Sequence, residues 1–246
     1  MAQHIALAIA DEERLDQQDP LRHLREHATI IPPQPTSVQN ALLDLAVPLP
    51  TPHPPIRLTL AVDAAPGCGG ITWPAGEVLA RYLARRGPRA LKGKRILELG
   101  SGTGLVGILA GALGADVWIT DQAPLVPTMH RNSELNAPLA PSVRVAELNW
   151  GEPIPPDLPP TFDLVLAADC VYFEPAFPLL VQTLRDLLPP AQRETEALFC
   201  YKKRRKADKR FFALLKKHFT WEDVKDDPER ETYAREAISL LRLRRR

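Results

Sequence analysis

Two segments of the sequence contain residue types that can bind a ligand and act on it. The first is ELGSGTGLVG (98–107), in which Glu98 precedes four glycines. Glycine allows positive φ and close approach of the backbone to a ligand, and a helix that starts after such a loop offers N–H donors without intrahelical partners. The second is LVLAADCVY (164–172), in which apolar residues run into Asp169 and Tyr172 follows three positions later. Together they predict a ligand site with a carboxylate beside it.

Two classes of ligand compete for the glycine loop. Gly102, Gly104 and Gly107 spell GxGxxG, and Asp121 follows about twenty residues on, as in a dinucleotide-binding fold. The strand before the loop, however, carries Glu98 where a dinucleotide fold has apolar residues. S-adenosylmethionine explains both carboxylates, because it has a cationic end and two ribose hydroxyls. It is therefore the favoured cofactor; a dinucleotide oxidoreductase and a glycine turn needed only for packing are the alternatives.

The elements that position these residues alternate regularly from residue 56 onward. Apolar periodicity predicts strands at 56–62, 95–99, 116–121, 143–148, 162–169 and 196–201, with helices at 75–87, 105–114, 124–136, 175–188 and 207–218. Two final strands, about 220–226 and 232–243, joined by the turn DDPER, predict an antiparallel hairpin. The predicted fold class is α/β, a doubly wound, Rossmann-like sheet that is mostly parallel. Ligands bind such sheets at the carboxyl ends of the strands, which puts Asp169 on the ligand edge.

Composition and charge narrow the class of protein. The chain has 246 residues, 45% of them hydrophobic, which suits one substantial core. The formal net charge is +1, so no overall field favours nucleic acid or a membrane surface as a partner. No apolar run approaches the ~18 residues that cross a bilayer. Three cysteines without a CxxC pair suit a reducing compartment, so the sequence predicts a cytoplasmic protein without a metal site.

Residues 1–55 differ from the rest of the chain. They contain the proline-rich stretches IIPPQPTS and VPLPTPHPP, and proline can neither donate to a sheet ladder nor continue a helix. This part is predicted to be a Pro-rich, partly irregular extension of a domain that covers 56–246. HLREH (23–27) matches a zinc-protease pattern, but no further ligand accompanies it, so a solvated helix is favoured.

Taken together, the motifs resemble the family 16 protein lysine methyltransferases, which have the seven-strand class I methyltransferase fold. The resemblance rests on GGITWPAGEVLARYL before the glycine loop, on ExGxGxG, on ELNW (147–150) and on AADCVY, and covers about residues 65–225. The segment YKKRRKADKRFF (201–212) is most similar to the fungal members that methylate elongation factor 1-alpha. The resemblance implies an S-adenosylmethionine-dependent protein-lysine N-methyltransferase, with elongation factor 1-alpha as its substrate.

The same resemblance implies the cofactor contacts one residue at a time. It puts an aromatic ring against the cofactor, glycine-loop residues under the methionine part, a carboxylate on the ribose, a second ring beside the adenine and a small residue in the lining. These residues are Trp73; Gly100, Ser101 and Gly102; Asp121; Trp150; and Ala168. Glu98 is added as a cofactor contact because its carboxylate suits the cationic end of the ligand. The alternative for the two tryptophans is that both are core aromatics.

Methyl transfer to lysine needs the neutral amine, whereas free lysine has a pKa near ~10.4. A carboxylate alone raises that pKa, so Asp169 is predicted to hold and align the amine, and something else must help to remove its proton. Desolvation and the sulfonium charge both act in that direction. Tyr172 offers a ring face or a hydroxyl, on the same side as Asp169 if the segment is helical. The alternative is a helix-capping Asp169 and a packing Tyr172.

The basic run KKRRKADKR (202–210) starts a predicted helix, where cations do not favour helix stability. We therefore expect it to dock an acidic patch of a protein substrate through Lys202, Lys203, Arg204 and Arg205, with RNA contact as the alternative. Other functions remain open: a methyltransferase for small molecules or nucleic acid, or a non-catalytic module of the same fold. DCVY, however, stands where enzymes that methylate base nitrogens have [ND]PP[YF].

Overall fold

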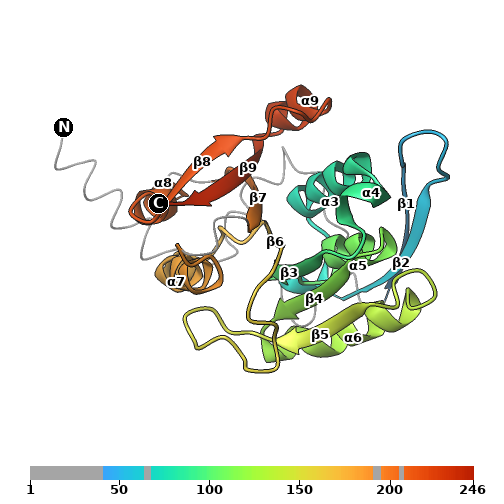
Figure 1. Ribbon diagram of the computed structural model, residues 1–246, viewed down its shortest axis with the longest axis horizontal. Coiled ribbons are helices and arrows are strands. Elements are labelled where there is room, and N and C mark those ends of the chain that lie inside the picture. The colour runs from blue at the N-terminus through green and yellow to red at the C-terminus, as the bar shows by residue number, and fades with distance from the viewer. Residues whose placement is uncertain (1–40, 64–67, 191–194, 205–207) are drawn as a thin grey trace. The chain divides into compact units, whose positions relative to one another are not determined.

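The computed structural model describes residues 41–63, 68–190, 195–204 and 208–246 (Figure 1). The HLREH stretch and Arg205 lie outside the described residues. The strands are β1 (Ala41–Val47), β2 (Ile56–Val62), β3 (Arg95–Leu99), β4 (Asp116–Asp121), β5 (Val143–Glu147), β6 (Leu164–Ala168), β7 (Glu196–Lys202), β8 (Phe219–Asp223) and β9 (Ile238–Arg245). The α-helices are α3 (Pro74–Arg86), α4 (Pro88–Leu91), α5 (Leu105–Ala112), α6 (Val126–Leu135), α7 (Phe177–Leu187), α8 (Asp208–Leu215) and α9 (Arg230–Arg235), and 3-10 turns cover Cys68–Gly70, Ala123–Leu125 and Glu174–Ala176.

Seven strands form the main sheet, in the order β5-β4-β3-β6-β7-β9-β8. The pairs from β5 to β7 are parallel, and β9 is antiparallel to both β7 and β8. The predicted α/β fold, mostly parallel with a C-terminal antiparallel hairpin, is confirmed. Along the chain, β4 and β5 are added on one side of β3, and β6 is then added on the other side. The switch in strand order therefore lies between β3 and β6. This is where such sheets bind ligands.

The register aligns the carboxyl ends of the central strands. Leu99 at the end of β3 pairs with Thr120 of β4 and with Ala167 of β6, and Ala168 pairs with Cys200 of β7. The residues that follow these positions in the chain therefore lie along one edge of the sheet. That edge carries the glycine loop, Asp121 and Asp169, as the strand pattern predicts.

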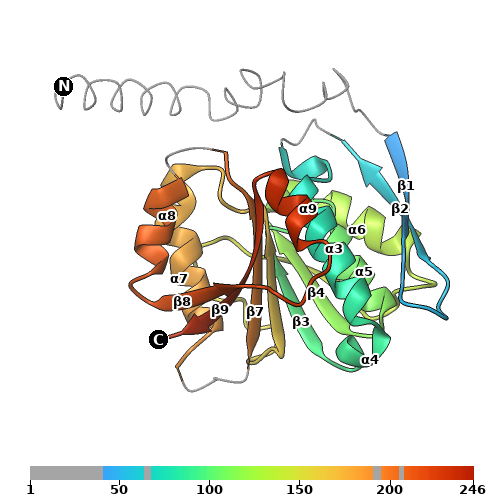
Figure 2. The same cartoon turned by 90° about the horizontal axis from the view of Figure 1, so that it is seen from above.

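The two faces of the sheet bury separate cores because alternate strand residues point to opposite sides. On β3, Ile96 packs with α3, α5 and α6, whereas Leu97 and Leu99 pack with α7 and α8. Figure 2 shows α3 and α5 on one side of the sheet and α7 and α8 on the other. Full burial of one such leucine contributes about 1.5–3 kcal/mol. Glu98 points to the same side as Ile96 and is a buried carboxylate on an otherwise apolar face.

Three elements differ from the sequence prediction. The short helix α4 follows Gly87, where the predicted helix 75–87 ends, and was not predicted. The predicted final strand at 232–243 begins only at Ile238, because residues 230–235 form the helix α9 and Ala237 then turns the chain with φ 59°. The strand β1 was not predicted, since it lies within the proline-rich segment assigned to the extension. It pairs antiparallel with β2 over its whole length, from Ala41 opposite Val62 to Val47 opposite Ile56.

Two asparagines of α6 bind the backbone of β2. Asn132 accepts the N–H of Ala61 (2.6 Å) and donates to the carbonyls of Ala61 (3.0 Å) and Thr103 (2.8 Å). Asn136, one helical turn later, accepts the N–H of Thr59 (3.1 Å) and donates to its carbonyl (2.8 Å). Together the two side chains satisfy backbone groups along β2 much as a neighbouring strand would, and Asn132 also ties β2 to the glycine loop.

Replacing Asn132 by alanine is expected to lower the free energy of unfolding by about 3 kcal/mol or more. Three backbone groups lose their partner at a fully buried position, and each costs about 1–3 kcal/mol. Urea unfolding measures the difference. Asn149→Ala is the matched control, since its amide bonds only the exposed Glu147 and Glu152, and a change within about 0.5 kcal/mol is expected there. Equal effects of the two substitutions would contradict this account of α6.

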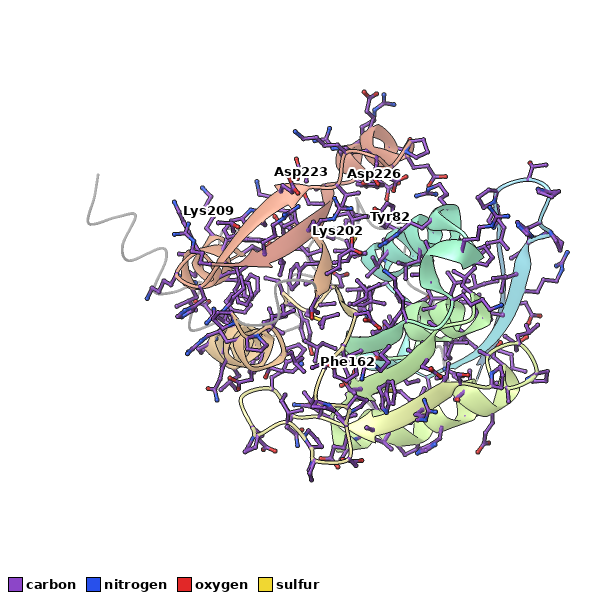
Figure 3. The ribbon with its side chains drawn as sticks, viewed as in Figure 1. Tyr82, Phe162, Lys202, Lys209, Asp223 and Asp226 are labelled. Carbon is purple, nitrogen blue, oxygen red and sulfur yellow. The ribbon has the colours of Figure 1, made fainter. Side chains whose placement is uncertain are left out.

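Charged side chains join α3 to the C-terminal hairpin. Tyr82 of α3 donates to Asp226 (3.3 Å), and Figure 3 shows the two labelled residues close together. Arg85 pairs with Asp227 (2.7 Å), a carboxylate with no exposed side-chain surface. The hairpin in turn supports the segment after β7, because the N–H of Lys203 donates to the carbonyl of Ala237 (2.8 Å). Lys203 is therefore held in place at the carboxyl end of β7.

Candidate active site at the carboxyl edge of the sheet

The glycine loop after β3 is fixed by its own hydrogen bonds. Gly100, Gly102 and Gly104 have φ values of 60°, 57° and 80°, which favour glycine. The N–H of Gly102 donates to Oδ2 of Asp121 (2.8 Å), and Oγ of Ser101 accepts the N–H of Thr120 (3.0 Å). The predicted loop residues and Asp121 are therefore brought together by direct bonds.

Glu98 has a structural reason to be in a buried strand. Its Oε2 accepts the N–H of Gly107 (2.8 Å), the third residue of α5, whose N-cap Gly104 has no side chain to do so. Burial raises the pKa of Glu98 to about 8, and the Gly107 hydrogen bond opposes the rise only in part. The reason that the sequence suggested, a cationic end of the ligand, is therefore not the one that the structure displays, and a direct cofactor contact of Glu98 stays a prediction.

Trp150 lies against the glycine loop. A Cβ placed on Gly100 would come within 3.0 Å of the Trp150 ring and of Sγ of Cys170, and one on Gly102 within 2.5 Å of the carbonyl oxygen of Gly69. The loop is thus enclosed by an aromatic ring, a thiol and a backbone carbonyl. Trp150 is only partly buried.

Asp121 retains acceptor capacity for a ligand. Its Oδ2 binds the N–H of Gly102 and its Oδ1 the N–H of Gln122 (2.8 Å), so each oxygen has one further lone pair beyond these bonds. Burial raises the pKa of Asp121, and the two backbone hydrogen bonds oppose that rise. Two acceptors beside a glycine loop and a partly open tryptophan fit the ribose and adenine of S-adenosylmethionine.

Asp169 follows β6 in a conformation that a non-glycine residue rarely adopts. Its φ is 58°, and its N–H donates to the carbonyl of Cys200 (2.8 Å). Its carboxylate is bound by Arg204 at both oxygens, Nη1 to Oδ1 at 2.7 Å and Nη2 to Oδ2 at 2.6 Å. The N–H of Lys202 also donates to Oδ1 (3.2 Å). The carboxylate that was predicted to hold a lysine therefore has an arginine partner that the sequence did not reveal.

The docking role predicted for Arg204 is corrected by this pair. Only 14% of the Arg204 side chain and 5% of the Asp169 side chain are exposed. The guanidinium also lies 5.3 Å from the ring centre of Trp73. Its charge is thus used inside the protein rather than offered to a partner surface. Lys203 is exposed and Lys202 is half-buried at the end of β7.

The residues after Asp169 are not helical. The next turn of helix begins at Glu174, with Phe173 before it, so both the helical offset between Asp169 and Tyr172 and the alternative of a helix-capping Asp169 are wrong. Tyr172 and Phe173 are 39% and 37% exposed. An aromatic surface therefore follows the carboxylate along the chain.

The structure links the predicted residues in two groups. The glycine loop, Asp121 and Trp150 form one group, and Trp73, Arg204 and Asp169 form the other. Cys170 joins them, since its thiol donates to the carbonyl of Leu99 (3.4 Å) and lies against Gly100. Ala168 is half-buried at the end of β6, directly before Asp169. Arg204 and Cys170 were missed as site residues because no spacing pattern pairs them with their contacts.

Two further properties concern the described ranges alone. Within them, no group of three or more His, Cys, Asp or Glu side chains could hold a metal ion. Among the same residues, no helix is both long enough and apolar enough to span a membrane.

Comparison with known proteins agrees with this geometry. A family model described as lysine methyltransferase matches residues 53–218. The chain is 42% identical over 208 residues to the protein-lysine N-methyltransferase EFM6 of Saccharomyces cerevisiae, covering 73% of this chain and 82% of that protein. It is also 42% identical over 125 residues to the mouse EEF1A lysine methyltransferase 3, covering 50% of this chain and 53% of that protein.

A solved structure supports the fold. A T. thermophilus 16S rRNA methyltransferase in complex with AdoMet and guanosine superposes with a TM-score of 0.55 at 18% identity, covering 87% of this chain and about half (52%) of that one. At that identity the likeness concerns the fold alone. The family model and the yeast relative confirm the resemblance that the motifs indicated. The chain belongs to the lysine methyltransferase family, and it is an S-adenosylmethionine-dependent protein-lysine methyltransferase.

Proposed function

We propose that this enzyme methylates a lysine side chain of elongation factor 1-alpha, and that the lysine reaches the methyl group beside Asp169. The observation that supports this most is the position of Asp169. It holds a carboxylate at the end of β6, next to the glycine loop of β3, in a backbone conformation with φ 58°. The name of the mouse relative, EEF1A lysine methyltransferase 3, supports the choice of substrate.

The proposed cofactor site uses the residues around the glycine loop. Asp121 accepts the ribose hydroxyls, Trp150 lies beside the adenine, and Gly100, Ser101 and Gly102 lie under the methionine part, with Trp73 and Ala168 completing the lining. When bound, S-adenosylmethionine supplies a methyl group activated by a sulfonium. The chain itself has to orient that group, exclude water and present a neutral amine in line with it.

The proposed lysine site uses Asp169 and Tyr172. A carboxylate oxygen of Asp169 accepts one N–H of the amine, which turns the nitrogen lone pair toward the methyl group. The exposed rings of Tyr172 and Phe173 attract the ammonium as it approaches and cover the aliphatic part of the side chain. Removal of water by these rings lowers the pKa of the incoming lysine.

The proposed docking surface consists of basic residues on the same edge. Lys203 is exposed after β7, Lys202 is half-buried beside it, and Lys209 is exposed on α8. Figure 3 shows Lys202 at the end of β7 and Lys209 farther out on α8. An acidic patch on the substrate is the complementary partner.

We further propose that the enzyme acts in the cytoplasm, because Cys170 and Cys200 are free thiols.

The substrate is tested by labelled methyl transfer from S-adenosylmethionine into a cell extract. One dominant labelled protein is expected, and peptide mass spectrometry should identify it as elongation factor 1-alpha. Purified elongation factor 1-alpha should accept the label as well. A different labelled protein would contradict the choice of substrate, and label in RNA would contradict the protein-directed reaction.

A further inference from the structure

The ion pair between Asp169 and Arg204 is unlike a surface salt bridge. Both oxygens of the carboxylate are bound, at 2.7 and 2.6 Å, and the side chains are only 5% and 14% exposed. Exposed pairs contribute little, whereas a bidentate, buried arginine–carboxylate pair is strong and fixed in direction. The pair also stands where the substrate lysine is proposed to enter.

Arg204 is held from several sides. Its backbone N–H donates to Oδ2 of Asp208 (3.0 Å), and the residue before it is bound to Ala237 of the hairpin. Its guanidinium lies over Trp73, at 5.3 Å from the ring centre. Displacing the guanidinium would break its two bonds to Asp169 and its contact with Trp73, and would leave a buried carboxylate without its charged partner, which is costly. The geometry therefore favours an arginine that stays in place.

A count of acceptors shows how a lysine can join the pair without displacing it. Oδ1 of Asp169 accepts from Arg204 and from the N–H of Lys202, which fills its two lone pairs. Among the described residues, Oδ2 accepts from Arg204 only. One lone pair of Oδ2 is left for a single N–H of the amine, which suits a neutral amine that is aligned by one bond.

The positive charge of Arg204 offsets the effect of the Asp169 carboxylate on the pKa of the substrate lysine. A lone carboxylate stabilises the ammonium form of the substrate and so opposes the reaction. Resting on the function proposed above, we propose that Arg204 is a positioning residue, which aims the Asp169 carboxylate and cancels its charge so that the bound lysine can lose its proton. The proton leaves to water, the nitrogen lone pair then forms the bond to the methyl carbon, and the bond from that carbon to sulfur breaks with its electrons remaining on sulfur. Arg204 is unchanged by the step.

Two buried thiols and a buried carboxylate lie around the pair. Cys170 lies next to Asp169 in the chain, Cys200 lies across from it on β7, and Asp208 binds the backbone of Arg204. Burial raises the pKa of both thiols well above the usual range, so they stay neutral at the pH of the assay. The two thiols therefore add no charge beside Asp169 and Arg204.

The test is the pH dependence of kcat for Arg204→Met. The product measured is methyllysine, and the substrate is the extract protein that the wild type labels. A unit charge about 5 Å away changes a pKa by roughly 1 to 2. The rising limb of the profile, the range in which kcat increases with pH, should therefore move to higher pH by about 1 to 2 pH units. Arg204→Lys should keep the limb in place but lower kcat about tenfold, because it keeps the charge and loses the bidentate geometry. The double variant with Asp169→Asn should return the limb toward the wild-type pH.

Arg244→Met is the matched control, since Arg244 pairs with Glu222 at an exposed position and its removal should leave the profile unchanged. Circular dichroism confirms that each variant is folded. A limb that stays in place in Arg204→Met, or moves to lower pH, would overturn the inference. A wild type that labels a protein other than elongation factor 1-alpha would contradict the choice of substrate alone, and one that forms no methyllysine would overturn both proposals.

Discussion

Replacing Gly102 by alanine is expected to weaken the binding of S-adenosylhomocysteine by roughly 100-fold, about 2.7 kcal/mol. The new Cβ would lie 2.5 Å from the carbonyl oxygen of Gly69, and a backbone atom cannot yield as a flexible side chain can. The φ of 57° adds strain for any residue with a Cβ. The loop must shift, and the bond from the Gly102 N–H to Asp121 shifts with it. Isothermal titration calorimetry measures the change.

Gly93→Ala separates backbone strain from the collision. Gly93 also has a positive φ, of 72°, but a Cβ there would meet no atom within 4 Å. It precedes β3, at the opposite end of this strand from the glycine loop. This variant should lose about 1–2 kcal/mol of stability and bind S-adenosylhomocysteine as the wild type does. Wild-type affinity in Gly102→Ala would show that the glycine loop does not contact the cofactor.

Glu98→Gln is expected to flatten the dependence of stability on pH. The pKa of Glu98 is raised from 4.5 to about 8 by burial, so between these values the folded protein holds a proton that the unfolded chain has lost. The free energy of unfolding should therefore fall as the pH rises through this range, by at most about 1.4 kcal/mol per pH unit. Glutamine resembles the protonated acid and can still accept the N–H of Gly107. The variant should match the wild type near pH 5 and exceed its stability at pH 8 by several kcal/mol.

Urea unfolding at a series of pH values checks this prediction. Glu134→Gln on the exposed face of α6 is the control and should keep the slope of the wild type. Asp121 contributes with the same sign, because burial raises its pKa as well, so a smaller slope should remain in Glu98→Gln. A wild type whose stability rises with pH in this range would contradict a proton on Glu98.

Local patterns in the sequence were enough to predict the sheet and the ligand edge. Strands and helices could be assigned because apolar residues recur at every second position in a half-buried strand and at every third or fourth position in a helix. The glycine loop lies where a strand with the first pattern ends and a helix with the second begins. Parallel strands then bring their carboxyl ends together, which is why Gly100, Asp121 and Asp169 could be expected near one another. Local patterns also gave the wrong predictions. The helix α9 interrupts what looked like one strand, and β1 lies in a segment dominated by proline.

The contacts that could not be predicted depend on how the elements pack against one another. Arg204 stands 35 positions from Asp169, inside a basic run whose charge suggested an outward surface. Nothing in the sequence selects one cation of that run as the partner of one carboxylate. Likewise, Glu98 seemed to need a ligand, and it was the packing of α5 against β3 that supplied the N–H of Gly107.

The central claim is that this edge of the sheet carries methyl transfer to lysine. The direct measurement uses labelled S-adenosylmethionine, the protein that becomes labelled, complete hydrolysis and amino-acid analysis, with wild type, Asp121→Asn and Asp169→Asn compared. The account predicts label in methyllysine with the wild type and a large loss with either variant. Label in another amino acid or in a nucleotide, or wild-type rates in both variants, would contradict it.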